Sequence, residues 1–263
     1  FFADLNDSPS GCTKLTLGLA MINLHNHTTW SDGRLTPQQL AEAAVGAGLT
    51  HIGITDHYLT RKLTHGYKCV DLHRLLDYIV EIRLLAKWHA KVKVLAGLEI
   101  DFSARTDLKP LLASQLLNQL DYVLFEYVAD AEWYGYPLDD LLLIRSQITV
   151  PVGLAHNPLA RNFELLLDAE DLVAILEDNA IFIELCPARR NAVFAPDGRP
   201  VLPYRYPTPY NEALWNAFSH SQVLFSIGSD THHGAAEVAE LSDAWEFLRE
   251  RNLLDHLVTE HHW

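Results

Sequence analysis

Histidine and carboxylate residues stand together at the ends of several short apolar runs. These run ends are His25-Asn26-His27, Thr55-Asp56-His57, Glu99-Ile100-Asp101, His156-Asn157 and Asp230-Thr231-His232. Because residues i and i+2 of a strand point to the same side, the two imidazoles of the first motif can bind one ion. Imidazole and carboxylate ligands together suit Zn²⁺, Mn²⁺ or Fe²⁺ better than Ca²⁺ or a thiolate cluster. The pattern therefore indicates a divalent-metal centre assembled from distant parts of the chain.

Apolar runs alternate with amphipathic stretches, and this alternation predicts the elements that position the metal-binding side chains. Strands are predicted at 22–25, 50–55, 92–100, 121–127, 151–155, 181–185 and 223–228. Helices are predicted at 36–47, 71–90, 108–119, 138–147, 169–178, 209–219 and 236–252. Strict alternation predicts a parallel sheet, and reactive residues at nearly every strand end favour a closed barrel over an open sheet. The irregular stretches 58–70 and 186–208 follow strand ends and are predicted to be active-site loops.

The composition is that of a globular protein with one large core, and its charge argues against binding along duplex nucleic acid. The chain has 263 residues, of which 34 are acidic and 20 basic, so the net charge is −14. A protein that coats a duplex carries a basic stripe, which this sequence lacks. Three cysteines without CxxC spacing indicate free thiols and a cytoplasmic location. No apolar run approaches the roughly 20 residues that span a bilayer.

The first twenty residues differ from the rest of the chain. They lack the lysine- or arginine-led start of a secretory signal, and the strand-like Met21-Ile22-Asn23-Leu24 follows them directly. We expect residues 1–20 to be an N-terminal appendage and residues 21–263 to form the catalytic barrel. The alternative is that Met21 marks no boundary and merely happens to be the only methionine of the chain.

Six motifs occur in a characteristic order: His25-x-His27, Ser31-Asp32-Gly33, Thr55-Asp56-His57, Glu99, His156 and Asp230-x-His232. This set resembles the PHP (polymerase and histidinol phosphatase) family, and the resemblance covers most of residues 21–233. It implies an α/β fold, namely a distorted seven-stranded (β/α)7 barrel similar to a TIM barrel. It also implies a centre of two or three divalent ions that hydrolyses phosphate esters.

The resemblance further implies which residues bind which ion. The expected groups are His25, His27, Glu99 and Asp230 for a first ion, Glu99 and His156 for a second, and Asp32, His57 and His232 for a third. Glu99 is expected to bridge two ions, as cations about 3.5–4 Å apart require. Asp56 is expected to be a buried hydrogen-bond acceptor beside the ligands, and His233 an exposed side chain.

The sequence departs from the family after the fourth predicted strand. The family pattern there is similar to D-Y-V-I-x-S-V-H, whereas this chain has Val128 at the histidine position. Glu126 lies two residues earlier, on the same strand face as position 128. A charged glutamate in so apolar a run is costly unless it is paired or bound to a metal. We therefore expect Glu126 to replace the missing ligand, with Asp130 as the second candidate. The alternative is a salt bridge of Glu126 inside the barrel.

Arginines near the predicted strand ends are candidates for binding a phosphate. Arg189 and Arg190 open the loop after the sixth predicted strand, at a place that resembles the arginine segment of the family, although Cys186 stands where the family has asparagine. A guanidinium binds phosphate in a bidentate manner. Arg161 is a further candidate. The alternative is that these arginines only decorate a surface loop.

These observations favour a metal-dependent phosphoesterase that acts on a small phosphomonoester or a nucleotide-like phosphate. The expected chemistry is in-line attack by hydroxide that the metals activate, with an arginine stabilising charge and a histidine such as His232, or a water, protonating the leaving oxygen. The alternatives are a non-catalytic, metal-stabilised binding domain and a C–N hydrolase on a similar barrel.

Overall fold

Two parallel sheets form the centre of the molecule. The computed structural model describes residues 21–61 and 68–258. The three-stranded sheet contains β1 (Ile22–Asn23), β2 (His51–Ile54) and β3 (Lys93–Ala96), in that order. The five-stranded sheet has the order β10-β7-β6-β5-β4, formed by Phe225–Ile227, Ile181–Leu185, Val152–Leu154, Val123–Glu126 and Glu99–Asp101. Every pair of neighbouring strands within these two sheets is parallel.

The two sheets close into a distorted barrel through isolated bridges at two seams. At the first seam, Asn26 pairs with Thr231, and the amide of Leu24 donates to the carbonyl of Ile227 over 2.8 Å. At the second seam, His57 pairs with Glu99. The expected α/β barrel is thereby confirmed, with one difference. The predicted strand 92–100 is two strands, because β3 pairs with β2 whereas β4 pairs with β5.

Two tyrosine hydroxyls supply hydrogen bonds where these seams interrupt the backbone ladder. The Tyr78 hydroxyl lies 2.9 Å from the carbonyl oxygen of Ile54 and 2.8 Å from that of Gly97. The Tyr122 hydroxyl donates to the carbonyl of Leu24 over 2.5 Å. Both tyrosines are fully buried, and a buried hydroxyl without a hydrogen-bond partner would cost stability.

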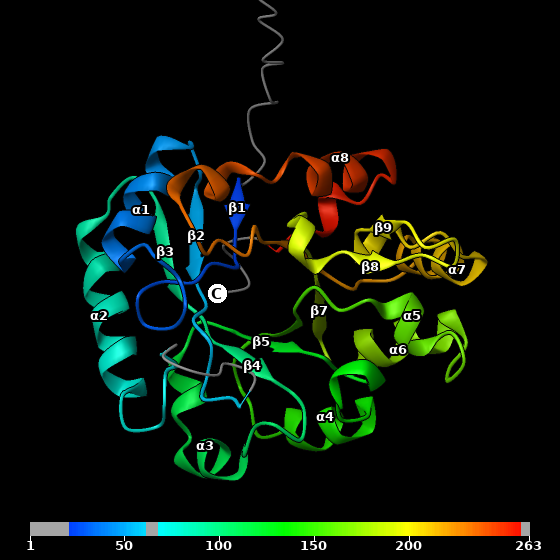
Figure 1. The fold of residues 1–263 in the computed structure, drawn as a ribbon, viewed down its shortest axis with the longest axis horizontal. Helices are drawn as coiled ribbons and strands as arrows, with labels where there is room; N and C mark the ends of the chain where they lie inside the picture. Colours follow the sequence, from blue (N-terminus) through cyan, green and yellow to red (C-terminus); the bar gives the residue numbers. More distant parts are fainter. Residues whose placement is uncertain (1–20, 62–67, 259–263) are drawn as a thin grey trace, which may run out of the picture.

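Helices surround the strands (Figure 1). They are α1 (Pro37–Gly46), α2 (Leu75–Trp88), α3 (Lys109–Ser114), α4 (Leu138–Arg145), α5 (Leu159–Phe163), α6 (Ala169–Asp178), α7 (Pro209–Phe218) and α8 (Ser242–Glu250). Helix α1 begins at a capping box in which the Thr36 hydroxyl accepts from the amide of Gln39 and the Gln39 side chain accepts from the amide of Thr36. Helix α6 has the predicted bounds. Helix α2 begins at Leu75, later than predicted, and ends at Trp88.

Three of the predicted segments are built differently from the expectation. The segment 108–119 is α3 followed by a 3₁₀ turn at Leu116–Gln119, and 236–252 is a 3₁₀ turn at Ala235–Ala239 followed by α8. The stretch 186–208 contains a short antiparallel hairpin, β8 (Val193–Phe194) and β9 (Pro200–Val201), which Figure 1 shows in yellow beside α7. Residues 1–20 and 62–67, the latter part of the other predicted loop, lie outside the described residues.

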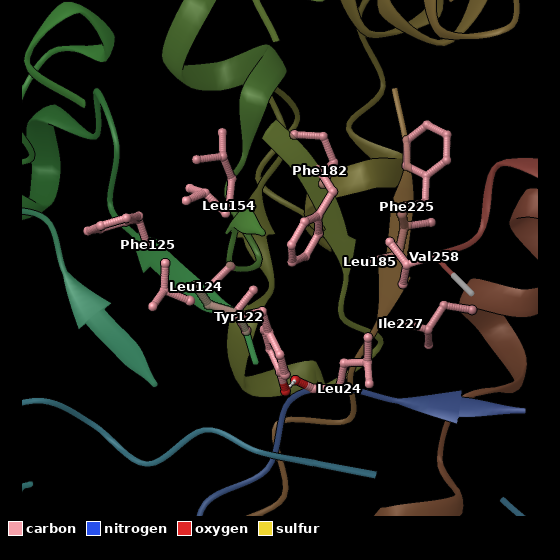
Figure 2. Packing of buried hydrophobic residues seen from close by; sticks show 14 of the residues in the cluster. Leu24, Tyr122, Leu124, Phe125, Leu154, Phe182, Leu185, Phe225, Ile227 and Val258 are labelled. Atoms are coloured by element: carbon pink, nitrogen blue, oxygen red, sulfur yellow. Dashed lines mark hydrogen bonds between the residues drawn. The ribbon is translucent and has the colours of Figure 1, made fainter. Parts of the chain in front are cut away.

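Buried apolar side chains from neighbouring strands pack together in the core. Figure 2 shows Leu124 and Leu154 from adjacent strands, together with Phe182 of β7 and Leu24, which follows β1. Full burial of one such side chain contributes about 1.5–3 kcal/mol. The core thus holds the strands whose ends carry the candidate ligands rigidly in place.

None of the described helices is both long and apolar enough to cross a membrane.

Candidate metal centre

The predicted ligands converge at the carboxyl ends of the strands. The structure brings all nine into one connected cluster: His25, His27, Asp32, His57, Glu99, Glu126, His156, Asp230 and His232. Their side chains range from fully buried to 13% exposed. So many ionisable groups away from water would be unfavourable unless they were paired with one another or bound to cations.

Donor atoms within this cluster fall into three groups, in each of which all atoms lie within 4.8 Å of one another. The groups are His27, Asp32, His57 and His232; His25, His27 and Glu99; and His57, Glu99 and Glu126. His156 belongs to none of them and reaches the cluster through Glu99 Oε1, 3.0 Å from its Nε2. The first group contains the three residues expected for the third ion together with His27, and the second contains three of the four expected for the first ion, without Asp230. Glu126 lies with His57 rather than with His156.

Glu99 is the carboxylate shared by the second and third of these groups. Its Oε2 atom lies 3.4 Å from Nε2 of both His25 and His27 and 2.9 Å from Nδ1 of His57. Despite that short distance, neither Glu99 Oε2 nor His57 Nδ1 has a hydrogen-bond partner among the described residues, and both atoms are buried. Two buried atoms with lone pairs, close together and without a hydrogen-bond partner, are what ligands of a common metal ion provide. The residues present therefore fit a multinuclear divalent-metal centre.

Two of the predicted ligands have an unusual backbone conformation. His156 has φ 30° and Asp230 has φ 52°, in the left-handed region that residues other than glycine rarely adopt. This turn places Asp230 Oδ1 at 3.0 Å from His27 Nε2 and 3.6 Å from His25 Nε2. Local strain of this kind is typical of functional sites.

Glu184 orients two of the candidate ligands, and the sequence analysis did not assign it this role. His25 Nδ1 donates to Glu184 Oε1 over 2.8 Å, so its Nε2 faces the cluster, and the amide of His156 donates to Oε2 over 2.8 Å. A carboxylate behind a ligating histidine fixes its tautomer and orientation. The signal in the sequence is a single carboxylate within the otherwise apolar strand β7, every residue of which is buried.

Asp56 is the buried acceptor that the sequence predicted. Its Oδ1 accepts from the amide and hydroxyl of Ser31, at 3.0 and 2.6 Å, and from the amide of Thr28 at 2.7 Å. Its Oδ2 accepts from the Thr28 hydroxyl. Burial raises the pKa of Asp56 although these hydrogen bonds oppose the shift. The loop between His27 and Asp32 is thereby fixed. His233 is exposed, as expected.

Burial and neighbouring charges together set the pKa values of the clustered side chains. Burial disfavours the charged form of His25, but the carboxylates of Glu184, Glu99 and Asp230 outweigh it and raise the pKa well above its usual value. Burial, together with His232 and His57, lowers the pKa of His27 to about 3. The imidazoles hold the pKa values of Glu99 and Asp230 well below the usual range despite burial. The carboxylates therefore carry the negative charge that attracts cations.

The structure corrects one step of the argument for Glu126. We expected residues 126 and 128 to share a strand face, but β5 ends at Glu126 and Tyr127 has φ 65°, which ends the alternation. Glu126 is fully buried with its Oε1 3.8 Å from His57 Nδ1. The second candidate, Asp130, instead pairs with Arg161. The geometry supports Glu126 as a ligand beside His57, and the assignment stays a prediction.

Replacing Glu126 by glutamine is expected to weaken one ion of the centre. The amide keeps the volume but loses the charge. Affinity for that ion should fall at least about tenfold, because replacing a residue that only supports a metal ligand already costs that much. Metal content per chain, measured by mass spectrometry after dialysis against buffered metal, should decrease. Asp130→Asn is the matched control and should keep the full content. Equal metal content in the two variants would refute Glu126 as a ligand.

The candidate phosphate-binding arginines lie in different surroundings. Arg190 Nε is 3.5 Å from Asp230 Oδ2, and its terminal nitrogen is 3.4 Å from Glu237 Oε2. Arg189 is exposed. Asn191, which the sequence analysis did not single out, donates to Asp230 Oδ2 over 2.9 Å. Of the two adjacent arginines, Arg190 is therefore the one beside the cluster.

A comparison with protein families identifies the chain. The sequence model of the PHP domain matches residues 23–188, which is more than half of the 263 residues. The chain belongs to the PHP domain family. The matched segment contains the first five of the six motifs quoted above, and it also contains Arg161. The sixth motif, Asp230-x-His232, and the adjacent Arg189 and Arg190 lie beyond it.

Curated relatives of this PHP protein share part of its sequence. The chain is 33% identical over 87 residues to the DNA polymerase/3'-5' exonuclease PolX of Bacillus subtilis (strain 168), covering 33% of this chain and 15% of the relative. It is 33% identical over 94 residues to the 5'-3' exoribonuclease Rnm of Salmonella typhimurium, covering 35% and 32%. Rnm of Escherichia coli is 31% identical over 100 residues, covering 38% and 32%. The matches thus span a third or less of the relatives' length.

A solved structure has the same fold over nearly the whole chain. It is the histidinol phosphate phosphatase of Lactococcus lactis subsp. lactis Il1403, in complex with zinc, L-histidinol and phosphate. The TM-score is 0.59 at 17% identity, covering 92% of this PHP protein and 96% of the phosphatase. This likeness shows that the distorted PHP barrel extends to the region beyond residue 188.

Proposed function

We propose that this PHP protein is a metal-dependent phosphoesterase that hydrolyses a small phosphomonoester or a nucleotide-like phosphate. The observation that carries the proposal is the buried Glu99 oxygen surrounded by three imidazoles without a hydrogen-bond partner among the described residues. Membership of the PHP family and the relatives named as a polymerase-exonuclease and exoribonucleases support phosphoester chemistry.

The donor set defines the cofactors that we propose, two or three ions of Zn²⁺, Mn²⁺ or Fe²⁺. Nitrogen and oxygen ligands without thiolate suit all three metals. His25, His27, Glu99 and Asp230 would hold one ion, and Asp32, His57 and His232 another, with Glu99 also serving a site beside His156 or Glu126. When bound, such ions supply Lewis acidity and lower the pKa of water, which makes hydroxide available near neutral pH.

The chain's own residues define what happens to the substrate around these ions. Glu184 and Asp56 hold the ligands in place, which limits reorganisation during the reaction. His232 Nδ1 donates to the backbone oxygen of Asp230 over 2.9 Å, so its Nε2 faces Asp32 Oδ1 at 3.3 Å. This orientation favours His232 as a ligand over His232 as the proton donor that the sequence suggested. Protonation of the leaving oxygen is then left to water.

Arg190 is proposed to bind the substrate phosphate, and Arg189 is its matched control. Arg190→Ala should lower kcat/KM roughly 10- to 150-fold, because a charge-assisted hydrogen bond contributes about 1.5–3 kcal/mol. Arg189→Ala should change it less than about twofold, as for most exposed side chains. Metal content should be unchanged in both variants because a guanidinium has no lone pair for a metal. If both retain the parent kcat/KM, Arg161 becomes the candidate.

The proposal is tested by release of inorganic phosphate from the metal-loaded protein. Separate samples are loaded with Zn²⁺, Mn²⁺ or Fe²⁺, their metal content is measured, and each is assayed with sugar phosphates, amino-alcohol phosphates and nucleoside monophosphates. Release that depends on the metal is expected with at least one class. Full metal content without release from any substrate would refute the proposal and favour the binding-domain alternative.

A further inference from the structure

A cavity of about 240 Å³ adjoins the metal-binding cluster. It lies between the loops that follow β5, β6 and β7, and its lining includes His156, a candidate ligand, and Asn191, which donates to Asp230. Arg190, the proposed phosphate-binding residue, also lines it. A group attached to a phosphate held at the metal centre can therefore enter this cavity.

Flat aromatic side chains form part of the cavity lining. The rings of Tyr127 and Trp133 are stacked with centroids 4.8 Å apart and an interplanar angle of 10°. The Arg105 guanidinium lies 5.0 Å from the Trp133 ring centroid and holds that ring in place. Phe194, on the hairpin β8–β9, also lines the cavity and is 71% exposed. An exposed phenyl ring at the mouth of a cavity is available to stack on a ligand.

The charges of the lining are already balanced. Arg161 pairs with Asp130 and Glu132, the latter over 3.0 Å. Arg190, near Asp230 and Glu237, is assigned to the phosphate at the metal centre. A second phosphate in the cavity would have to separate Arg161 from the buried Asp130 carboxylate, which is unfavourable. The lining thus selects an uncharged group.

The volume sets the size of that group. A cavity of about 150 Å³ is enough to hold benzene, and the present one is larger but below the usual range for drug-sized ligands, about 300–1,000 Å³. This volume is that of a group about the size of one ring system.

We propose that this cavity binds the organic part of the substrate and selects phosphomonoesters that carry an uncharged, planar aromatic ring, with Phe194 stacking on it. This inference rests on the proposed function, because the metal centre is taken to hold the phosphate. It assigns specificity to a hairpin outside the matched PHP segment.

The test compares two ligands that cannot be hydrolysed, 2-phenylethylphosphonate and ethylphosphonate. Their dissociation constants are measured by calorimetry on protein of verified metal content. The phenyl ligand should bind at least about threefold more tightly to the parent protein, and Phe194→Ala should reduce that ratio about 2- to 12-fold, the range expected for an aromatic pair. Leu165→Ala, which removes another exposed apolar side chain (92% exposed), should leave the ratio unchanged.

The outcomes separate the inference from the proposed function. Equal affinity for the two ligands, an unchanged ratio in Phe194→Ala, or binding of neither phosphonate would each overturn the inference. Phosphate release without a phenyl preference would support the function alone. A phenyl preference that depends on Phe194, without phosphate release from any substrate, would support the inference and refute the function.

Discussion

Glu99→Gln is expected to lower kcat/KM at least about a thousandfold, because ions of this kind supply several kcal/mol of transition-state stabilisation. The carboxylate lies within 3.4 Å of nitrogens from His25, His27 and His57 through one oxygen and within 3.0 Å of His156 through the other. Glutamine keeps the shape but replaces one oxygen by a nitrogen without a lone pair for a metal. More than one ion should therefore be lost.

Metal content and phosphate release are measured together on this variant, with circular dichroism to confirm the fold. Glu212→Gln is the matched control, because Glu212 is 69% exposed and pairs with Arg251 over 2.9 Å. It should retain both properties, since exposed ion pairs contribute little. A Glu99→Gln protein that keeps its full metal content and its turnover would show that the ions are held elsewhere.

Gly228→Ala is expected to damage the metal centre although residue 228 carries no side chain. A Cβ at this position would lie 2.1 Å from Glu184 Oε1 and 2.3 Å from His25 Cβ. Because the root of the His25 side chain cannot move without its strand, the hydrogen bond between Glu184 and His25 must give way. Loss of such a contact costs about 10- to 100-fold in metal affinity, and overpacking about 1–3 kcal/mol of stability.

Thermal unfolding and metal titration of the Gly228→Ala variant check this expectation. The midpoint temperature should fall by about 2–10 °C for a chain of this size, and metal affinity should fall with it. Gly46→Ala makes the same change in helix α1, where an added Cβ would meet nothing within 4 Å. It should be neutral or stabilise by up to about 1 kcal/mol. Equal behaviour of the two variants would contradict the steric argument.

Strand ends were predictable from the sequence because each combines an apolar run, which predicts the strand, with histidine or carboxylate residues, which predict metal binding. The motif His25-x-His27 follows an apolar run, and Thr55-Asp56-His57 follows another, so both the element and its last residues are visible locally. The break within 92–100 was not visible, because the run is apolar on both sides of Gly97. It depends on which sheet each half joins, and that is decided by distant strands.

Features that depend on distant contacts or on backbone conformation were harder to predict. Glu184 gives no local sign of its contact with His25, 159 positions away. The hairpin β8–β9 has strands of two residues each, too short for any periodicity. The end of β5 was predicted one residue too late because the positive φ of Tyr127 has no signature in the side-chain pattern.

The candidate ligands belong to both sheets of the barrel. His25, His27 and His57 follow β1 and β2 of one sheet, whereas Glu99, Glu126, His156 and Asp230 lie on or follow strands of the other. Backbone pairing between the sheets consists of isolated bridges and a few hydrogen bonds around them, so an ion bound here would also cross-link two halves of the fold. Thermodynamic linkage then adds about 1.4 kcal/mol to native-state stability for each tenfold rise in free metal above the dissociation constant. Metal binding would in this way stabilise the closed barrel against opening along its seams.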